Sequence, residues 1–440
     1  MRIVVLGGGF GGVAAARHLE RRLGRRQDVE LSLVSRENFF VVTPLLFEAC
    51  SGRLELRHCA QPIRAALRRT RFVEAIVQGV DVQRQIVRAV VPDEGTYHEL
   101  PYDHLVVALG ASTNEQLIPG SSHAFTFKTM ADALVLRNHL IEQFERADAT
   151  ADRGMRHACL TVVIIGGGLV GIELLGELTA LADDVLRFYP RLRRGEIRFL
   201  LFEAGARVLP EIDEQLTLVA RRVLEQRGAD IRAATPVRSI EAGRVHLANE
   251  TIDAATIVLA AGIVPNVVAA QIPVVHDQRG RVAVDATLRS RSHANVWALG
   301  DCAAIPSPDG RTYPALAQHT VREGRHLAQN INAVIDGRVP TPFVYRSLGT
   351  MVSLGHTRAV ARVGRLRLTG FVAWWIRRTY YLFQMPRWDR RLRIVFDWTV
   401  ALLFRPDITK VELRVEREQV RRSREMAASA TNRARPDAHE

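Results

Sequence analysis

The chain has 440 residues, of which 47% are hydrophobic and 24% are charged. This composition is ordinary for a globular protein with two or three domains and a sizeable core. The formal net charge is +13, and lysine occurs only at positions 128 and 410, a bias toward arginine that we attribute to genome composition. The aromatic residues do not alternate with basic ones as a nucleic-acid platform requires, so we expect no nucleic-acid partner.

The cysteine pattern and the apolar runs exclude further classes of protein. The cysteines form neither a CxxC pair nor a cluster with histidine, so we predict no metal site and a reduced cytoplasmic chain. They are Cys50, Cys59, Cys159 and Cys302. The first apolar run, residues 3–6, is too short for a signal peptide. No stretch reaches the roughly 18–20 apolar residues of a membrane-spanning helix.

Two parts of the chain repeat the same predicted order of strand, glycine-rich turn, helix and strand. Short apolar runs predict the strands, and apolar residues at helical spacing predict the helices. The first unit comprises strand 2–6, helix 10–23 and strand 30–34, and the second comprises strand 161–165, helix 169–182 and strand 197–202. This duplication predicts an α/β fold with two Rossmann-like dinucleotide-binding domains.

Each glycine-rich turn has the form Gly-x-Gly-x-x-Gly. The first glycine permits a tight turn, the second lets the backbone approach a pyrophosphate, and the third lets the helix pack closely on the strand. The helix N-terminus adds N–H groups and a partial positive charge. The residues expected at the two phosphate sites are Gly7, Gly9, Phe10 and Gly12 in the first unit and Gly166, Gly168 and Gly171 in the second. Two such turns predict that one chain binds two nucleotides.

The residue that ends the second strand of each unit is expected to be acidic, because a carboxylate there binds ribose hydroxyls. In the second unit this residue is Glu203, which would repel a 2′-phosphate and therefore favours NADH over NADPH. In the first unit Ser35 stands at this position. Arg36 or Glu37 is expected to share the ribose and adenine end there, with the alternative that Glu37 is a solvated loop charge.

Further segments extend the duplication. An amphipathic helix at 131–147 joins the units, and strand-and-turn segments at 76–107 and 231–262 end in the similar sequences "HLVVALGAS" and "TIVLAAGIVPN". The residues expected there to line the bound nucleotides are Ala108, Gly110, Ala261 and Gly262. In "ANVWALGDCAAIP" a short apolar strand leads to Gly300 and Asp301. An isolated Gly-Asp is usually only a turn, but after two dinucleotide folds we favour a carboxylate that binds the ribityl chain of a flavin.

Together these features resemble the type II NADH dehydrogenases, which are single-subunit NADH:quinone oxidoreductases among the flavoproteins with two dinucleotide-binding domains. The resemblance covers roughly residues 1–412 and includes both glycine turns, "PLLFEACSG", "AAGIVPN", "ALGDCAAIP" and "PALAQHTVREG". It implies FAD on the first unit and NADH on the second. It also implies hydride transfer from NADH to the flavin, followed by transfer of two electrons to a membrane quinone, either menaquinone or ubiquinone.

The resemblance implies roles for individual residues as well. Glu173 would lie near the nicotinamide and the flavin. Gln318 and Ala317 would meet flavin and quinone from a helix that starts near residue 315, and Glu323 would belong to a glutamine- or glutamate-rich turn beside them. The positions at which the chain departs from the family pattern are Ser35, Thr320 and Arg322.

Simpler roles are the alternative for several of these residues. Glu173 and Glu177 are compatible with helix-dipole complementarity or a salt bridge, and Gln318 with an ordinary polar position on a helix. His319 and His356 are candidate proton donors to quinone, with packing or surface histidines as the alternative.

The C-terminal part is rich in tryptophan, because four of the five lie between residues 374 and 398. Segments 370–388 and 391–404 are predicted amphipathic helices that are too short to span a membrane. We expect them to anchor the protein peripherally on the cytoplasmic face of the cell membrane, with Arg377 and Arg378 extending to lipid phosphates. The alternative is a domain core or a dimer interface, and a homodimer would present paired anchors.

The expected domain order follows from these segments. It comprises an FAD-binding domain at 1–125 and 286–345, a connecting helix region at 126–160, an NAD(H)-binding domain at 161–285, a membrane-anchoring or dimer domain at 346–412, and a disordered tail at 413–440. The predicted function is an FAD-dependent NADH:quinone oxidoreductase. It is not expected to pump protons, because a pump needs a path through the membrane.

Three other functions use parts of the same pattern. A sulfide:quinone oxidoreductase needs a redox cysteine pair beside the flavin, and no cysteine follows Cys302. A ferredoxin-type acceptor would suit the basic charge but leaves the tryptophan-rich C-terminus without a role. A non-catalytic NAD(H)-sensing protein would keep both nucleotide sites and would hold a flavin that NADH does not reduce.

Overall fold

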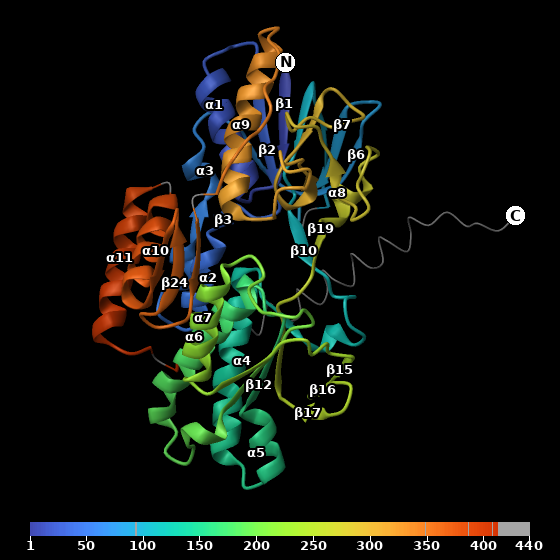
Figure 1. Ribbon diagram of the computed structural model, residues 1–440. Helices are drawn as coiled ribbons and strands as arrows, with labels where there is room; N and C mark the ends of the chain where they lie inside the picture. The colour runs from blue at the N-terminus through green and yellow to red at the C-terminus, as the bar shows by residue number, and fades with distance from the viewer. Residues whose placement is uncertain (93–94, 348, 386, 407, 412–440) are drawn as a thin grey trace, which may run out of the picture. The chain divides into compact units, whose positions relative to one another are not determined.

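The structure is a computed structural model that describes residues 1–92, 95–347, 349–385, 387–406 and 408–411. By its internal contacts the chain divides into two parts, Met1–Pro406 and Asp407–Glu440. The helices and strands labelled in Figure 1 belong to the first part. The tail predicted at 413–440 lies outside the described residues.

The first large sheet is parallel, with the strand order β21-β9-β1-β2-β5. Its strands are β1 (Arg2–Leu6), β2 (Glu30–Ser35), β5 (Arg71–Glu74), β9 (His104–Val107) and β21 (Val296–Ala298). Four residues of β1 are buried, which explains its uninterrupted apolar sequence, because the central strands of parallel sheets are covered on both faces. β21 pairs with β9 although the whole second unit lies between them in the sequence.

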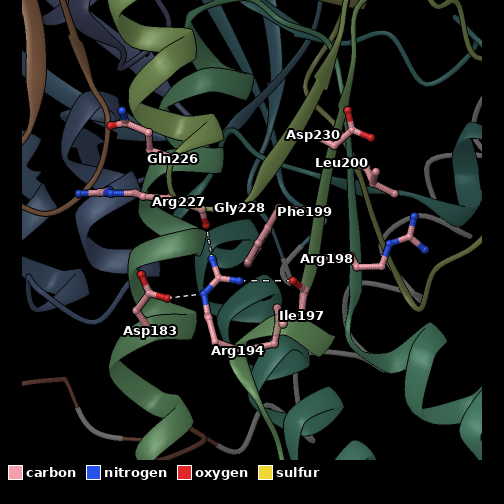
Figure 2. Close-up of a pocket in the computed structure, with 11 residues that line it drawn as sticks. Asp183, Arg194, Ile197, Arg198, Phe199, Leu200, Gln226, Arg227, Gly228 and Asp230 are labelled. Carbon is pink, nitrogen blue, oxygen red and sulfur yellow. Dashed lines mark hydrogen bonds and ion pairs between the residues drawn. The ribbon is translucent and has the colours of Figure 1, made fainter.

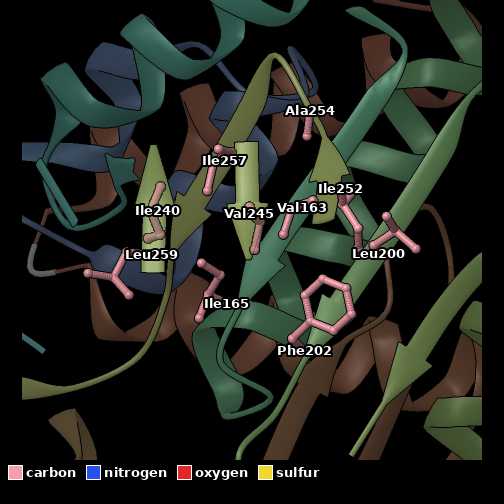
Figure 3. Close-up of a cluster of buried hydrophobic side chains, with 10 residues drawn as sticks. All are labelled: Val163, Ile165, Leu200, Phe202, Ile240, Val245, Ile252, Ala254, Ile257 and Leu259. Atoms are coloured by element: carbon pink, nitrogen blue, oxygen red, sulfur yellow. The ribbon is translucent and has the colours of Figure 1, made fainter. Parts of the chain in front are cut away.

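The second large sheet is also parallel, with the order β11-β18-β12-β13-β14. Its strands are β11 (Phe125–Thr126), β12 (Thr161–Ile165), β13 (Arg198–Phe202), β14 (Ala229–Arg232) and β18 (Thr256–Leu259). One face packs on the antiparallel sheet of β15 (Ser239–Glu241), β16 (Arg244–His246) and β17 (Thr251–Asp253). Figure 3 shows this core, where Val163, Ile165, Leu200 and Phe202 meet Ile240, Val245 and Ile252.

Smaller sheets surround the two large ones. Their strands are β3 (Phe39–Val41) with β4 (Ala60–Pro62); β6 (Ile76–Asp81), β7 (Ile86–Val90) and β8 (Tyr97–Pro101); β10 (Ala111–Thr113) with β19 (Ile263–Pro265); β20 (Val282–Ala283) with β22 (Ala303–Ala304); and β23 (Gly349–Ser353), β24 (Ala359–Val363) and β25 (Leu366–Thr369). The β10–β19 pair connects the two large sheets, because β10 follows β9 of the first sheet and β19 follows β18 of the second.

Helices α1 (Phe10–Leu23) and α9 (Ala317–Ile335) pack against each other over the first sheet (Figure 1). Glycine makes this contact close. A Cβ atom at Gly324 would lie 2.9 Å from the carbonyl oxygen of Gly11, which is shorter than a van der Waals contact. The remaining helices are α2 (Leu46–Cys50), α3 (Ile63–Ala66), α4 (Met130–Ala149), α5 (Arg153–Cys159), α6 (Leu169–Val185), α7 (Glu214–Glu225), α8 (Val267–Gln271), α10 (Gly370–Gln384) and α11 (Trp388–Leu403).

Most predicted boundaries are confirmed to within a few residues. β1, α1 and β12 have the predicted limits, whereas α6 continues to Val185 instead of ending at 182. The expected start of α9 near 315 is confirmed to within two residues. Leu316 is still extended, with φ −125° and ψ 134°, so the helix begins at Ala317.

The C-terminal helices α10 and α11 occupy the two predicted amphipathic segments. α10 packs on the sheet of β23, β24 and β25, and their shared core is formed by Ala359, Ala361, Ala373 and Trp374. No helix within the described ranges is both long enough and apolar enough to cross a membrane.

Candidate functional site

The first glycine turn connects β1 to α1. Gly7 has φ +104°, a backbone conformation that favours glycine, and its N–H donates to the carbonyl of Val34 at 2.8 Å. A Cβ atom at Gly12 would overlap the carbonyl oxygen of Gly7. At Gly9, by contrast, a Cβ atom would meet no other described atom within 4 Å. The turn is therefore closed toward the protein and open at Gly9, as a pyrophosphate site requires.

The second glycine turn, between β12 and α6, repeats this geometry. Gly166 has φ +114°, and its N–H donates to the carbonyl of Phe202 at 2.8 Å. A Cβ atom at Gly171 would overlap the carbonyl oxygen of Gly166, and one at Gly168 would meet no described atom within 4 Å. The two turns therefore form two candidate phosphate sites with the same backbone geometry, one at each large sheet.

Glu203 ends β13 directly beside the second turn. Its carboxylate accepts the N–H groups of Gly167 at 2.7 Å and Gly205 at 2.6 Å. Ser35 takes the matching place in the first unit, because a Cβ atom at Gly8 would lie 2.5 Å from the Ser35 hydroxyl oxygen. The two positions therefore differ in charge but not in location.

Arg36 and Glu37 follow Ser35 and pair with each other. The Arg36 Nε lies 3.0 Å from a Glu37 carboxylate oxygen, and both side chains are well exposed. Glu37 therefore matches the alternative of a solvated loop charge, and any contact of Arg36 with a nucleotide remains a prediction.

The predicted residues after β9 and β18 adjoin the two turns. A Cβ atom at Gly7 would overlap the carbonyl oxygen of Ala108, and one at Gly166 would lie 2.7 Å from the Cβ of Ala261. Gly110 and Gly262 have φ +69° and +70°. In each unit the expected residues are gathered at the carboxyl ends of neighbouring parallel strands, where open α/β sheets bind their ligands.

The Gly300–Asp301 turn follows β21 as a single 3₁₀ turn, Gly300–Cys302. The Gly300 N–H donates to the Glu323 carboxyl at 2.9 Å. Burial raises the pKa of Glu323 to about 8. The prediction of a turn around Glu323 is wrong, because this residue lies inside α9 and holds the Gly300 turn from within the core.

Lys128 is a residue that the sequence interpretation missed. Its ammonium group donates to the carbonyl of Ala111, directly after Gly110. Burial lowers the pKa of Lys128, and the nearby Asp301 opposes that shift. A signal was available in the sequence: lysine is kept here in a chain that otherwise uses arginine almost throughout. A compact ammonium group differs in chemistry from a guanidinium group.

Ala317 and Gln318 form the first turn of α9. The Gln318 side-chain amide donates to the Ser347 hydroxyl at 3.1 Å and to the Gly349 carbonyl at 3.3 Å. Arg322 lies one turn on, with its guanidinium 4.5 Å from the centroid of the Tyr345 ring. These contacts fix the orientation of the Gln318 amide.

Thr320, the other departure from the family pattern in α9, packs against the Gly300 turn. A Cβ atom at Gly300 would lie 3.1 Å from the Thr320 methyl group. The Thr320 side chain therefore fills the space beside the Gly300 turn.

Glu173 is buried in a salt bridge with Arg377. The Arg377 Nη2 lies 2.9 Å from a Glu173 oxygen, and the Ser353 N–H donates to the same oxygen at 2.7 Å. The structure therefore displays the salt bridge that was the alternative for Glu173. Its position near a nicotinamide remains a prediction.

The expectation that Arg377 and Arg378 extend to lipid phosphates is wrong. Both guanidinium groups point into the protein, with exposed fractions of 0% and 6%. Arg378 Nη2 lies 2.8 Å from the Glu48 carboxylate. Glu48 is distant in the sequence, so the segment around 377 gave no sign that its arginines would have buried partners.

His319 and His356 match the alternative of packing histidines. His356 Nδ1 lies 2.6 Å from a guanidinium nitrogen of Arg53. Burial and the nearby Arg53 lower the pKa of His356 to about 4, so it is neutral at pH 7. His319 is buried against the edges of the Tyr313 and Tyr345 rings, and burial lowers its pKa.

A pocket of about 600 Å³ lies at the opposite end of the second sheet (Figure 2). It adjoins the amino ends of β13 and β14, whereas ligands of parallel sheets bind at the carboxyl ends. Arg194 is held there by Asp183 at 2.5 Å and by the Ile197 carbonyl at 3.3 Å. We therefore exclude this pocket from the candidate site.

The sequence matches one known protein family over most of the chain. A model described as pyridine nucleotide-disulphide oxidoreductase matches residues 1–324. The chain belongs to this family. It is 29% identical over 426 residues to the type II NADH:quinone oxidoreductase NdhA of Mycobacterium tuberculosis, covering 92% of this chain and 87% of that protein.

A second relative and a solved structure extend the comparison. The chain is 30% identical to the demethylphylloquinone reductase NdbB of Synechocystis, covering 90% of this chain and 95% of the relative. NDH2 of Plasmodium falciparum, solved in complex with NADH, has the same fold. Its TM-score is 0.85 at 20% identity, over 93% of this chain and 99% of that one. The resemblance to type II NADH dehydrogenases is therefore confirmed.

The Arg377 salt bridge can be tested by removing its charge. Arg377→Leu leaves the Glu173 carboxylate buried without a cation, so we expect it to lower the free energy of unfolding by about 3–5 kcal/mol. Arg221→Leu breaks an exposed pair with Glu225 at 2.6 Å, and its expected cost is at most about 1 kcal/mol. Urea denaturation of both variants checks this. Equal effects would contradict the burial argument.

Proposed function

We propose that the protein is an FAD-dependent NADH:quinone oxidoreductase that does not pump protons. The observation that carries this proposal is the pair of glycine turns with one geometry, of which only the second adjoins an acidic residue, Glu203. The two sites have the same backbone geometry but differ in the charge of the residue at the strand end, which suits two different nucleotides. The match to a type II NADH:quinone oxidoreductase over 92% of this chain supports the same pair of substrates.

We assign FAD to the first unit and NADH to the second. The residues proposed to hold FAD are Gly7, Gly9, Phe10, Gly12, Ser35, Arg36, Ala108, Gly110, Gly300, Asp301, Ala317 and Gln318. Those proposed to hold NADH are Gly166, Gly168, Gly171, Glu203, Ala261 and Gly262. The domain limits given by the sequence are kept as part of this proposal.

The residues present fit these two groups. The open space at Gly9 and Gly168 leaves room for a pyrophosphate against the backbone, and a helix N-terminus follows each turn. Glu203 accepts two backbone N–H groups and keeps lone pairs for ribose hydroxyls, while its charge repels a 2′-phosphate. Ser35 carries no such charge, so it does not repel a phosphate group on the ribose.

FAD bound at the first turn supplies the chemistry, because a flavin accepts hydride from NADH and passes electrons singly or in pairs to a quinone. The protein contributes position and field. Gln318, fixed by Ser347 and Gly349, presents its amide at the N-terminus of α9, where partial positive charge stabilises an anion. Glu173, held by Arg377, is assigned to the face that the nicotinamide and quinone share.

We infer that α10 and α11 seat the protein peripherally on the cytoplasmic face of the cell membrane. Their outer surfaces expose large apolar side chains, while Arg377 and Arg378 of α10 point inward, and such helices lie in the plane of a bilayer surface. The residues that form this apolar face are Phe371, Val372, Trp375, Phe383, Trp388, Leu392, Phe396, Leu402 and Leu403. A homodimer formed through this face is the alternative. The quinone, menaquinone or ubiquinone, would enter from the lipid.

The sulfide:quinone alternative is the least supported of the competing functions. All four cysteines are free and buried, so no disulfide is present for sulfide oxidation. The complete second turn with Glu203 has no role in an enzyme that does not bind NADH.

The first test is an anaerobic titration of the purified protein, with the flavin absorbance followed. NADH is expected to bleach the flavin, and a short-chain quinone is expected to restore it. Bleaching without recovery would point to a protein acceptor such as ferredoxin. A flavin that NADH does not bleach would favour an NAD(H)-sensing protein.

A second prediction concerns nucleotide choice. Glu203→Ala removes the charge that binds the ribose and repels a 2′-phosphate, so we expect a higher KM for NADH and a smaller preference over NADPH, by about 10-fold or more. Steady-state kinetics with both nucleotides measure the change. Glu37→Ala, at the exposed pair in the first unit, serves as the matched control. An unchanged preference in Glu203→Ala would remove this residue from the ribose site.

A third prediction concerns the apolar face. Truncation before Phe371 would uncover the buried carboxylates of Glu48 and Glu173, so surface exchanges are the better test. The double variant Trp375→Gln, Phe396→Gln is expected to lose most of its binding to anionic phospholipid vesicles while remaining folded, because both side chains are exposed. Tyr97→Gln, 75% exposed on β8, is the control. Vesicle binding that survives the double exchange would exclude this anchor.

A further inference from the structure

A buried cluster of charged groups lies between α6 and α10. Its carboxyl groups belong to Glu48 of α2 and to Glu173 and Glu177 of α6, and its guanidinium groups to Arg377 and Arg378 of α10. No member has an exposed fraction above 6%. We call these five residues the charge cluster.

Both guanidinium groups in the charge cluster are committed to two of the three carboxyl groups. Arg377 Nη2 lies 2.9 Å from Glu173, and Arg378 Nη2 lies 2.8 Å from Glu48. The indole N–H of Trp398 donates to Glu48 at 2.8 Å. Glu48 and Glu173 therefore each have a guanidinium group as a direct partner, and at Glu173 the Arg377 charge opposes the rise in pKa that burial causes.

Glu177 is bonded differently. The Ser51 hydroxyl lies 2.9 Å from its Oε2, and the Ser353 hydroxyl lies 3.1 Å from its Oε1. Within the described part of the chain Glu177 makes no ion pair. The nearby guanidinium group of Arg53 is bound directly to Asp184, and that of Arg227 donates to the carbonyl groups of Leu354 and His356.

A carboxylate in this position would be expensive. Isolated buried charges cost so much solvation energy that the group takes up a proton instead. Burial raises the pKa of Glu177, and the charge of Glu48 adds to that rise, while Arg53, Ser51 and Arg378 oppose it. Three carboxyl groups and two committed guanidinium groups leave the charge cluster neutral when it holds one proton.

We propose that Glu177 carries that proton and donates it during formation of the quinol, with Ser51 and Ser353 as its hydrogen-bond partners. This inference rests on the proposed function. The balance is NADH + H⁺ + quinone → NAD⁺ + quinol, in which NADH supplies a hydride and the remaining proton comes from outside the nucleotide. The O–H bond of Glu177 breaks, an O–H bond of the quinol forms, and solvent later returns a proton to the Glu177 carboxylate.

The position of Glu177 suits this role. Glu177 lies on α6, the helix that begins at the second glycine turn, and its carboxyl group is close enough to α10 to interact with the charge of Arg378. Ser353 connects it to Glu173, because the Ser353 N–H binds Glu173 while its hydroxyl binds Glu177. Burial and the charge of Arg53 lower the pKa of His356 to about 4, so it is not an imidazolium acid at pH 7, and burial also lowers the pKa of His319.

The test is infrared difference spectroscopy of the flavin-loaded protein, oxidised minus NADH-reduced, combined with stopped-flow reoxidation by a short-chain quinone. Glu177→Gln has nearly the shape of the protonated acid, so we expect it to fold and to be reduced by NADH at the normal rate. It should lose the redox-linked carbonyl band of a protonated carboxyl group. Its reoxidation by quinone should slow by about 100-fold, the usual range for a lost general acid.

Glu323→Gln is the matched control, because Glu323 is another buried carboxyl group whose pKa burial raises, as burial also does for Glu173 and Asp301. This variant should keep the redox-linked band, and it tests the proposal by itself if Glu177→Gln does not fold. A band that persists in Glu177→Gln, a band lost only in Glu323→Gln, or unchanged reoxidation of Glu177→Gln would overturn the assignment. A wild-type flavin that NADH fails to reduce would instead overturn the proposed function.

Discussion

The absence of a Cβ atom at two helix positions determines where both nucleotides are expected to bind. Gly12 and Gly171 each touch the carbonyl oxygen of the first glycine in their own turn, so each helix starts against its strand without a side chain between them. This contact directs the N–H groups of the helix N-terminus at the open second glycine. The strand-end residues Ser35 and Glu203 and the residues after β9 and β18 take their places around it.

The C-terminal helices show how one segment satisfies two environments. The outer surface of α10 is apolar, and its inner surface carries two arginines that neutralise buried carboxylates of α2 and α6. These charges hold the helix in one orientation, because rotation about its axis would separate Arg377 from Glu173 and Arg378 from Glu48. A buried salt bridge contributes little net stability, so we infer that here it mainly specifies which surface of α10 faces outward.

The sequence predicted the local elements well and the long-range contacts poorly. The apolar runs, the glycine spacing and the amphipathic segments led to correct strands, helices and turns, because these signals depend on neighbouring residues. Arg377 and Arg378 were misassigned, since an arginine beside tryptophan looks alike whether it meets a phosphate or a distant glutamate. The partners of Glu323 and Lys128, which are Gly300 and Ala111, could not be predicted locally, because only the fold brings them near.

The antiparallel pairing of β10 with β19 has a consequence for electron transfer between the two halves. Each strand begins just past a residue proposed to line a nucleotide, so main-chain hydrogen bonds connect the two proposed sites directly. Main-chain hydrogen bonds do not depend on which side chains occupy these strands. We therefore expect the distance between the two proposed nucleotide sites to be unaffected by exchange of the side chains of Ser112 or Val264. The sequence of these two strands can then change without changing the separation between the nicotinamide and flavin sites.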